Sequence, residues 1–134
     1  MTDVVAPDAD LLARAIHTFL NTAADASYLK SPNTLTFTAL TDNTLTGWCW
    51  GYHLPRPDGS SMLYLHQLEV LESHRSQGIG RQLLTTFITT GQSLGATKMF
   101  LTTGANNTPA RNLYDSMGGG LSTQGATVNY WFLL

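Results

Sequence analysis

The sequence predicts an α/β protein built on one mixed sheet that carries helices on both faces. Five segments have the composition of strands, and the clearest of them alternate polar and apolar residues, as half-buried strands do. Three other segments carry apolar residues at the spacing of one helix face. The predicted order along the chain is αβββαβαβ, which is typical of a mixed sheet covered by helices. A length of 134 residues is enough for one core, so residues 1–134 are expected to form a single domain.

The first predicted helix begins close to Asp8, whose carboxylate suits the positive end of a helix dipole. Its apolar face is formed by Leu11, Leu12, Ala15, Ile16, Phe19 and Leu20. One or two further helical turns are expected between Asp25 and Lys30, because Pro32 disfavours a helix beyond them.

Three predicted strands follow this helical region. Residues 34–40 and 45–54 are expected to form a hairpin around the turn residues Asp42 and Asn43. Residues 62–71 form the third strand, in which regular alternation places two sets of side chains on opposite faces. One face is expected to hold Met62, Tyr64, His66, Leu68 and Val70, and the other Leu63, Leu65, Gln67 and Glu69.

Two more helices are expected in the second half of the chain. The first has the apolar stripe Ile79, Leu83, Leu84, Phe87 and Ile88. Either Gly91 or Gly95 is suited to end it. The second covers residues 107–117, with Pro109 in its first turn and Gly118 just past its end, a common arrangement at helix boundaries.

Two short strands complete the predicted sheet, at residues 97–102 and 127–134. The final strand is rich in aromatic residues, namely Tyr130, Trp131 and Phe132. An aromatic, apolar final strand favours a homodimer as a hypothesis.

Composition and charge exclude several classes of protein. Hydrophobic residues make up 43% and charged residues 12% of the chain, which is ordinary for a folded globule and not for a disordered one. The net charge of −2 provides no basic patch for nucleic acid, so no nucleic-acid partner is expected. No apolar run approaches the ~20 residues of a membrane helix, and the N-terminus has no signal-peptide pattern. A cytoplasmic protein without a membrane partner is therefore expected.

The residues with metal or thiol chemistry are scattered along the chain. The four histidines form no cluster in sequence, so no metal site is expected. Cys49 is the only cysteine and cannot form an internal disulfide. Its place between two tryptophans in a strand indicates buried packing and not a nucleophile.

The most informative segment is the turn Arg75-Ser76-Gln77-Gly78-Ile79-Gly80-Arg81, between a strand and a helix. Glycine lets the backbone approach a ligand closely, because it has no Cβ. The N–H groups of the first helical turn have no partner within the helix, and the helix dipole favours an anion there. The two arginines add charge suited to phosphate oxygens. The turn therefore predicts a pyrophosphate site, although a glycine-softened turn with surface arginines would have the same sequence.

Two patterns make the chain similar to the GNAT superfamily of N-acetyltransferases. The family pattern Arg/Gln-x-x-Gly-x-Gly/Ala after a strand is matched by Arg75, Gly78 and Gly80. A second pattern, Asn-x-x-Ala-x-x-Leu-Tyr-x-x-x-Gly, is matched by Asn107, Ala110, Leu113, Tyr114 and Gly118. The resemblance covers residues 8–134 and implies a GNAT-like fold, with the central sheet splayed between strands 62–70 and 97–102.

The resemblance implies acetyl-CoA as the cosubstrate, with its pantetheine arm between the two splayed strands. Backbone groups of Leu68 and Val70 would hydrogen-bond the pantetheine. The pyrophosphate would be held by the turn residues Arg75, Ser76, Gln77, Gly78, Ile79, Gly80 and Arg81. The second pattern adds Asn107, Ala110 and Tyr114 to the implied acetyl-CoA site, with Tyr114 close to the thioester sulfur.

Within the superfamily, residues 51–59 and 64–70 are similar to type I aminoglycoside 3-N-acetyltransferases. This similarity implies a small-molecule amine acceptor, an aminoglycoside, and a role in antibiotic resistance. The chain departs from the family at Gln67, where members often have an acidic residue. It also has Gly118-Gly119-Gly120 in place of the family's Gly-Phe. Carboxylates suited to a polycationic acceptor are Asp25, Asp58, Glu69 and Glu72.

Acetyl transfer by direct attack in a ternary complex requires a neutral amine and a proton for the departing thiolate. His66 is a candidate base, because an imidazole titrates close to neutral pH. Glu69 is a candidate to hold the ammonium or accept its proton, and Tyr114 to protonate the sulfur. The resemblance implies the backbone N–H of Val70 as the donor to the carbonyl oxygen. A regular strand would place His66 and Glu69 on opposite faces, whereas a bulge would bring them together.

Two other readings of the same residues stay open. The acceptor is alternatively a peptide N-terminus, a lysine or a polyamine. A non-catalytic acetyl-CoA binding or sensing domain would keep the turn at 75–81 but would not need Tyr114. For Tyr114 and His66, ordinary packing in a helix stripe and in a sheet are the structural alternatives to catalysis.

Overall fold

The computed structural model describes residues 1–134, apart from the side chain of Ala26. The chain forms two compact units, residues 1–102 and 103–134, and each is described by itself. The single domain expected over 1–134 stays a prediction. None of the described helices is long and apolar enough to cross a membrane.

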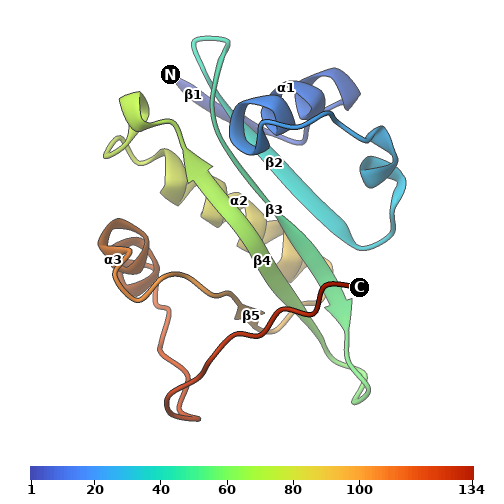
Figure 1. Cartoon of the computed structure of the whole chain (residues 1–134), viewed down its shortest axis with the longest axis vertical. Coiled ribbons are helices and arrows are strands. Elements are labelled where there is room, and N and C mark those ends of the chain that lie inside the picture. Colours follow the sequence, from blue (N-terminus) through green and yellow to red (C-terminus); the bar gives the residue numbers. More distant parts are fainter. The chain divides into compact units, whose positions relative to one another are not determined.

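The first unit contains a five-stranded sheet whose strands are arranged side by side in chain order (Figure 1). The strands are β1 (Thr2–Val5), β2 (Thr34–Thr41), β3 (Thr44–Pro55), β4 (Ser61–Val70) and β5 (Met99–Phe100). The first four are antiparallel to their neighbours, and β5 is parallel to β4. The sheet is therefore mixed, as expected.

The order predicted from the sequence was wrong at the N-terminus, because it missed β1. This short edge strand pairs with β2, with Thr2 opposite Thr41 and the two hydroxyl oxygens 2.6 Å apart. A strand of four residues is too short to show a period in sequence. The predicted strand at 97–102 is also shorter in the structure, since only Met99–Phe100 pairs.

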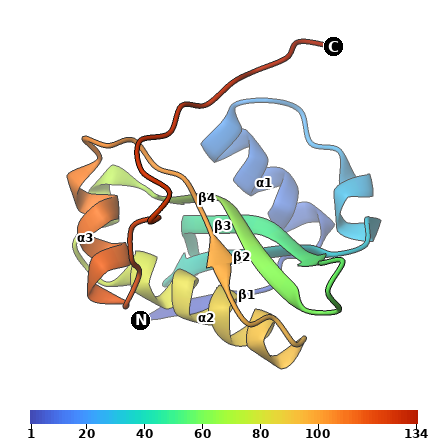
Figure 2. The same ribbon diagram turned by 90° about the horizontal axis from the view of Figure 1, so that it is seen from below.

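Helices cover both faces of the sheet in this unit (Figure 2). The α1 helix (Ala9–Leu20) and the short 3-10 helix η1 (Ala26–Lys30) lie on one face, and α2 (Ile79–Ser93) lies on the other. We refer to these as the α1-side and α2-side faces. Both the first helix and the turn before Pro32 were predicted correctly, and α2 ends before Gly95 (φ 102°) while Gly91 stays inside it.

The α1-side face is packed through aromatic rings. Asp8 caps α1 by accepting a hydrogen bond from Leu11 N at 2.8 Å. Leu12 and Ala15 of α1 are buried against Leu45 and Trp48 of β3. The ring of Phe19 stacks on Trp48 with centroids 5.6 Å apart. This packing fixes α1 over the first half of β3.

The α2-side face is packed through close contact of backbone and aliphatic side chains. A Cβ added at Gly51 would overlap the carbonyl oxygen of Tyr64 and lie 3.0 Å from Phe87 Cζ of α2. A Cβ at Gly91 of α2 would overlap the side chain of Leu63. Cys49 is fully buried on this face, 3.8 Å from the carbonyl oxygen of Leu83. Absence of side chains at these glycines lets α2 lie directly on the sheet.

A β-bulge at His66 changes the predicted faces of β4. Trp50 of β3 is opposite Gln67 and Gly51 is opposite Leu65, so His66 is an extra residue in β4. The prediction that His66, Leu68 and Val70 share one face was therefore wrong. Leu68 pairs with the α2-side residue Cys49, and Val70 with Gly47. Gln67 and Glu69 consequently join Tyr64 and His66 on the α1-side face.

The second unit contains the helix α3 (Thr108–Ser116). Asn107 caps its start by accepting a hydrogen bond from Ala110 N at 3.3 Å. At its end Gly118 is left-handed (φ 93°), and Gly119 N donates to Tyr114 O while Gly118 N donates to Asp115 O. These two bonds form a Schellman motif, and they confirm the predicted helix end.

The predicted strand at 127–134 was wrong, because these residues have no strand structure. A strand requires a partner for its ladder hydrogen bonds, and alternation of side chains cannot supply one. Tyr130, Trp131 and Phe132 are 79–86% exposed. Their apolar character in the sequence is therefore not matched by burial.

Candidate functional site

The edge of β4 that faces β5 is paired only at its beginning. The ladder between these strands contains Leu63–Met99 and Tyr64–Phe100, and β4 continues for six residues to Val70. Leu71 N donates to Thr46 O on the β3 side. Because the backbone of a strand alternates its direction, the N–H and C=O groups of Leu68 and Val70 face the other, open edge. The splay expected between these two strands is thus present.

The open edge leads into the turn that precedes α2. After the 3-10 helix η2 (Glu72–His74), Arg75 folds back and its Nε donates to Val70 O at 3.1 Å. Ser76 (φ 63°) and Gly78 (φ 82°) are both left-handed. Gly78 is the N-cap of α2 and supplies no side-chain cap.

This local geometry suits an anion. The helix ladder begins with Gln82 N, which donates to Gly78 O, so the N–H groups of Ile79, Gly80 and Arg81 precede the first intrahelical donor. No atom lies within 4 Å of a Cβ built at Gly78, so the backbone is open to a close approach. The turn at 75–81 therefore presents backbone N–H groups at the positive end of a helix, where an anionic group is favoured.

The bulge gathers polar and aromatic groups on the α1-side face of β3 and β4. Trp50 Nε1 donates to Gln67 Oε1 at 3.0 Å, and Gln67 Nε2 donates to Glu69 Oε2 at 3.0 Å. The His66 ring stacks on Trp50, with centroids 4.3 Å apart and planes 12° apart. Tyr64 meets His66 edge to face at 5.5 Å. In this cluster His66 is exposed, while Trp50, Gln67 and Glu69 are half-buried.

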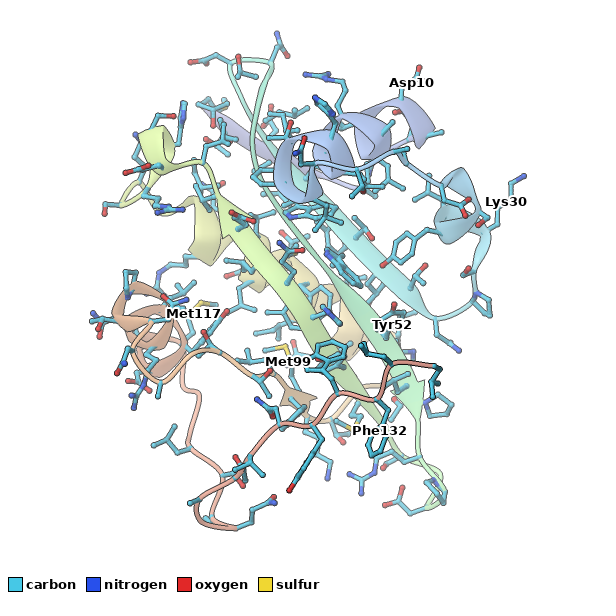
Figure 3. The ribbon with its side chains drawn as sticks, in the orientation of Figure 1. Asp10, Lys30, Tyr52, Met99, Met117 and Phe132 are labelled. Carbon is cyan, nitrogen blue, oxygen red and sulfur yellow. The ribbon has the colours of Figure 1, made fainter. Side chains whose placement is uncertain are left out.

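The structure thus brings together His66 and Glu69, which regular alternation would have separated. Sequence reasoning gave no role to Trp50 and treated Gln67 only as a departure from the family. The signal that could have identified Trp50 is the pairing of β3 with β4. These two strands are joined by a short loop, which fixes the residues that lie opposite one another. Tyr52 continues the same row of rings on β3, 6.1 Å from Trp50, and is labelled in Figure 3.

The remaining predicted site residues lie in the second unit. Asn107 uses its Oδ1 as the cap of α3, which leaves its amide nitrogen as a donor. Ala110 contributes the backbone N–H of that cap. Tyr114 lies on α3 and is half-buried.

The other candidates have structural roles. Burial raises the pKa of the Cys49 thiol to about 12, which keeps it protonated and unreactive. The pKa of Asp58 is lowered by its hydrogen bonds from Ser60, and that of Asp25 by its bonds from Ser27. Both carboxylates therefore stabilise local turns. Among the described residues no three histidine, cysteine or acidic side chains form a group that could hold a metal.

Solved structures similar to this chain share its fold at low sequence identity. An aminoglycoside acetyltransferase from an uncultured soil metagenomic sample has a TM-score of 0.83 and 19% identity, over 100% of this chain and 99% of that one. AAC(6′)-Iy in complex with a CoA bisubstrate analogue has a TM-score of 0.79 and 18% identity, over 100% and 99%. A ribosomal-protein-alanine N-acetyltransferase from Brucella melitensis biovar Abortus 2308 has a TM-score of 0.76 and 19% identity, over 96% and 99%.

A search of curated proteins gives no sequence match. The sequence model of the Acetyltransferase (GNAT) family matches residues 8–118, which is most of the chain. This range contains both of the sequence patterns and the open edge of β4. The fold, with its mixed five-stranded sheet between α1 and α2, is that of the family. The chain therefore belongs to the GNAT family of acetyltransferases and is an acyltransferase.

Proposed function

We propose that the chain transfers the acetyl group of acetyl-CoA to a primary amine by direct attack in a ternary complex. The observation that carries this proposal is the open edge of β4, which runs directly into the glycine turn before α2. A backbone edge suits the amide groups of a pantetheine arm, and the turn suits a pyrophosphate. Acetyl-CoA supplies the acetyl group as a thioester.

Binding of the cosubstrate is assigned to backbone groups more than to side chains. Leu68 and Val70 would bond the pantetheine amides, and the amides from Gln77 to Arg81 would hold the phosphates. Arg75 supports the same region, because its side chain ties the turn to Val70 O. The second unit would contribute Asn107, Ala110 and Tyr114, as the family pattern implies.

The transfer step requires three functions from the chain. A base removes one proton from the ammonium form of the acceptor, and the neutral nitrogen attacks the carbonyl carbon. The carbon–sulfur bond breaks, and the nitrogen gives up its second proton as the thiolate receives one. We assign the base to His66, which is exposed on the α1-side face and held by its stack on Trp50. The Val70 N–H would donate to the carbonyl oxygen, and the Tyr114 hydroxyl would protonate the thiolate.

The proposed acceptor is an aminoglycoside, acetylated at its 3-amino group. Support comes from the similarity of residues 51–59 and 64–70 to type I aminoglycoside 3-N-acetyltransferases, and from the aminoglycoside acetyltransferases among the similar folds. One of those proteins carries 6′ in its name, so the position of the new acetyl group has to be read from the product. A peptide N-terminus is the second candidate, supported by the ribosomal-protein-alanine acetyltransferase of similar fold.

Thiol release from acetyl-CoA tests the proposal over a panel of aminoglycosides, polyamines and peptides. Turnover with an aminoglycoside, and an acetyl group at the 3-amino position by mass spectrometry and NMR, is the expected result. Turnover with peptides alone would contradict the aminoglycoside acceptor. Binding of acetyl-CoA without turnover on any amine would instead indicate a sensing domain.

Tyr114→Phe separates chemistry from binding. Loss of a general acid lowers kcat by about 10²-fold or more, while the affinity for acetyl-CoA should stay unchanged. An unchanged kcat would remove Tyr114 from the proposed mechanism.

A further inference from the structure

The hydrogen-bonded chain of Trp50, Gln67 and Glu69 is explained by neither the fold nor the cosubstrate site. It lies on the α1-side face of the sheet, whereas the backbone groups of Leu68 and Val70 face the open edge of β4. Its two hydrogen bonds, each 3.0 Å long, connect an indole to an amide and that amide to a carboxylate. We propose that the hydrogen bonds among Trp50, Gln67 and Glu69 determine acceptor specificity. In this proposal Gln67 positions Glu69 to hold a second ammonium of a polyamino acceptor while another amine is acetylated. The proposal rests on the acetyltransferase function proposed above.

The orientation of the Gln67 amide is fixed by Trp50. An indole nitrogen is a donor only, so it requires the oxygen end of the amide. The NH₂ end must then point toward Glu69, where it donates to Oε2. Without the indole N–H, the amide could rotate and turn its oxygen toward the carboxylate. Trp50 therefore sets which end of Gln67 faces Glu69.

This contact restricts the orientation of the Glu69 carboxylate but does not use all of its hydrogen-bond acceptor positions. An ionised carboxylate has two oxygens with about four acceptor positions, and Gln67 supplies one donor to one oxygen. Half-burial beside the rings of Trp48 and Trp50 lowers the local dielectric, which strengthens its attraction for a cation. A held, partly desolvated carboxylate is the group that an ammonium requires.

The bulge places this anchor beside the proposed base. His66 is the extra residue of β4, and Gln67 and Glu69 follow it on the same face. A polyamino acceptor can therefore present one amine to His66 and a second to Glu69. A monoamino acceptor can use only one of the two groups. We therefore expect a higher kcat/KM for di- and polyamines than for monoamines, and we expect this preference to depend on Gln67.

The test compares two acceptors and four proteins. Neamine, a two-ring aminoglycoside with several amines, is compared with glucosamine, which has one. We expect the wild type to favour neamine in kcat/KM by about 100-fold, in keeping with a hydrogen-bonded ion pair. Gln67→Leu and Glu69→Gln should each reduce this ratio about tenfold, and the reduction should appear as a raised KM for neamine. The double variant should be no worse than Glu69→Gln alone, since both changes remove one interaction.

Controls separate a positioning role from a structural one. Trp50→Phe keeps a ring but removes the N–H donor, so it should lower the preference by a few-fold, about the effect of one hydrogen bond. Gln92→Leu makes the same substitution at an exposed position of α2 and should change nothing. KM for acetyl-CoA should stay within about twofold in all variants, because the cosubstrate edge is untouched.

Two results would overturn the inference while leaving the proposed function intact. One is acetylation of neamine with a preference that Gln67→Leu does not alter. The other is additive loss in the double variant, which would mean that Gln67 does not act through Glu69. If the wild type acetylates no amine, the proposed function fails. Calorimetric binding of neamine to wild type and Gln67→Leu then decides the inference alone, with equal affinities contradicting it.

Discussion

The two faces of the central sheet differ in how closely they are packed. On the α2-side face, glycines at 47, 51 and 91 allow backbone and aliphatic groups into direct contact, and Leu83 and Phe87 are completely buried. On the α1-side face, α1 packs on Trp48, and the row of rings beyond Trp48 includes the exposed His66. On the α2-side face, a Cβ added at any of the three glycines would therefore press on backbone or side-chain atoms. The other keeps polar groups half-accessible, and the proposed chemistry lies there.

The largest expected effect comes from adding one methyl group to the close-packed face. Gly51→Ala would place Cβ onto the Tyr64 carbonyl and against Phe87, where backbone cannot move aside easily. Strain of this kind in a full core costs about 3 kcal/mol or more of the free energy of unfolding. Urea denaturation followed by circular dichroism measures it.

Gly120→Ala is the matched control for this substitution. Its added Cβ has no neighbour within 4 Å, so it should change stability by about 0.5 kcal/mol or less. Equal stability of the two variants would contradict the account of the α2-side packing.

The next effect distinguishes function from stability on the α1-side face. His66→Ala removes the proposed base, so kcat should fall by about 10²-fold, while unfolding free energy changes by about 1 kcal/mol or less from the lost ring stack. His17→Ala, at an exposed histidine of α1, should leave both quantities unchanged. A fall in stability as large as that of Gly51→Ala would mean that His66 is a packing residue.

A bulge is the reason that the two faces could not be fully assigned from the sequence. Alternation along 62–71 predicted the strand, but one extra residue at His66 exchanges the faces of everything after it. That insertion depends on how β3 pairs with β4, so it is a property of two strands together. The edge strand β1 was missed for a similar reason, since its four residues are defined by Thr38–Thr41 of β2.

Local signals were more reliable where a single residue decides the backbone. Gly118 ends α3, Asp8 begins α1, and Asp42 and Asn43 both adopt positive φ in the predicted hairpin turn. The turn at 75–81 could be predicted because its glycines and arginines by themselves indicate an open backbone and a positive charge. The Trp50–Gln67–Glu69 chain could not be, because its members come together only through register and bulge.

The smallest expected effect concerns Cys49, on the close-packed face. Its raised pKa means that iodoacetamide should not label the folded protein at pH 8 but should label it in urea, as mass spectrometry can show. The sign of the pH dependence follows from the same shift. The pKa of the folded protein's thiol lies above its ordinary value of 9.0, so this contribution to stability is present below pH 9 and is lost as pH rises toward 12. Rapid labelling of the folded protein at pH 8 would contradict the burial.

Amide chemical shifts during a titration with CoA test the division between the two faces most directly. In ¹⁵N-labelled protein, the largest changes should occur at Leu68, Val70 and the amides from Gln77 to Arg81, with little change at the Trp50 indole. Neamine added afterwards should then shift the Trp50 indole N–H, which reports on Gln67 and Glu69. If CoA instead shifts the α1-side cluster and leaves the 77–81 amides unchanged, the assignment of the cosubstrate to the open edge of β4 is wrong.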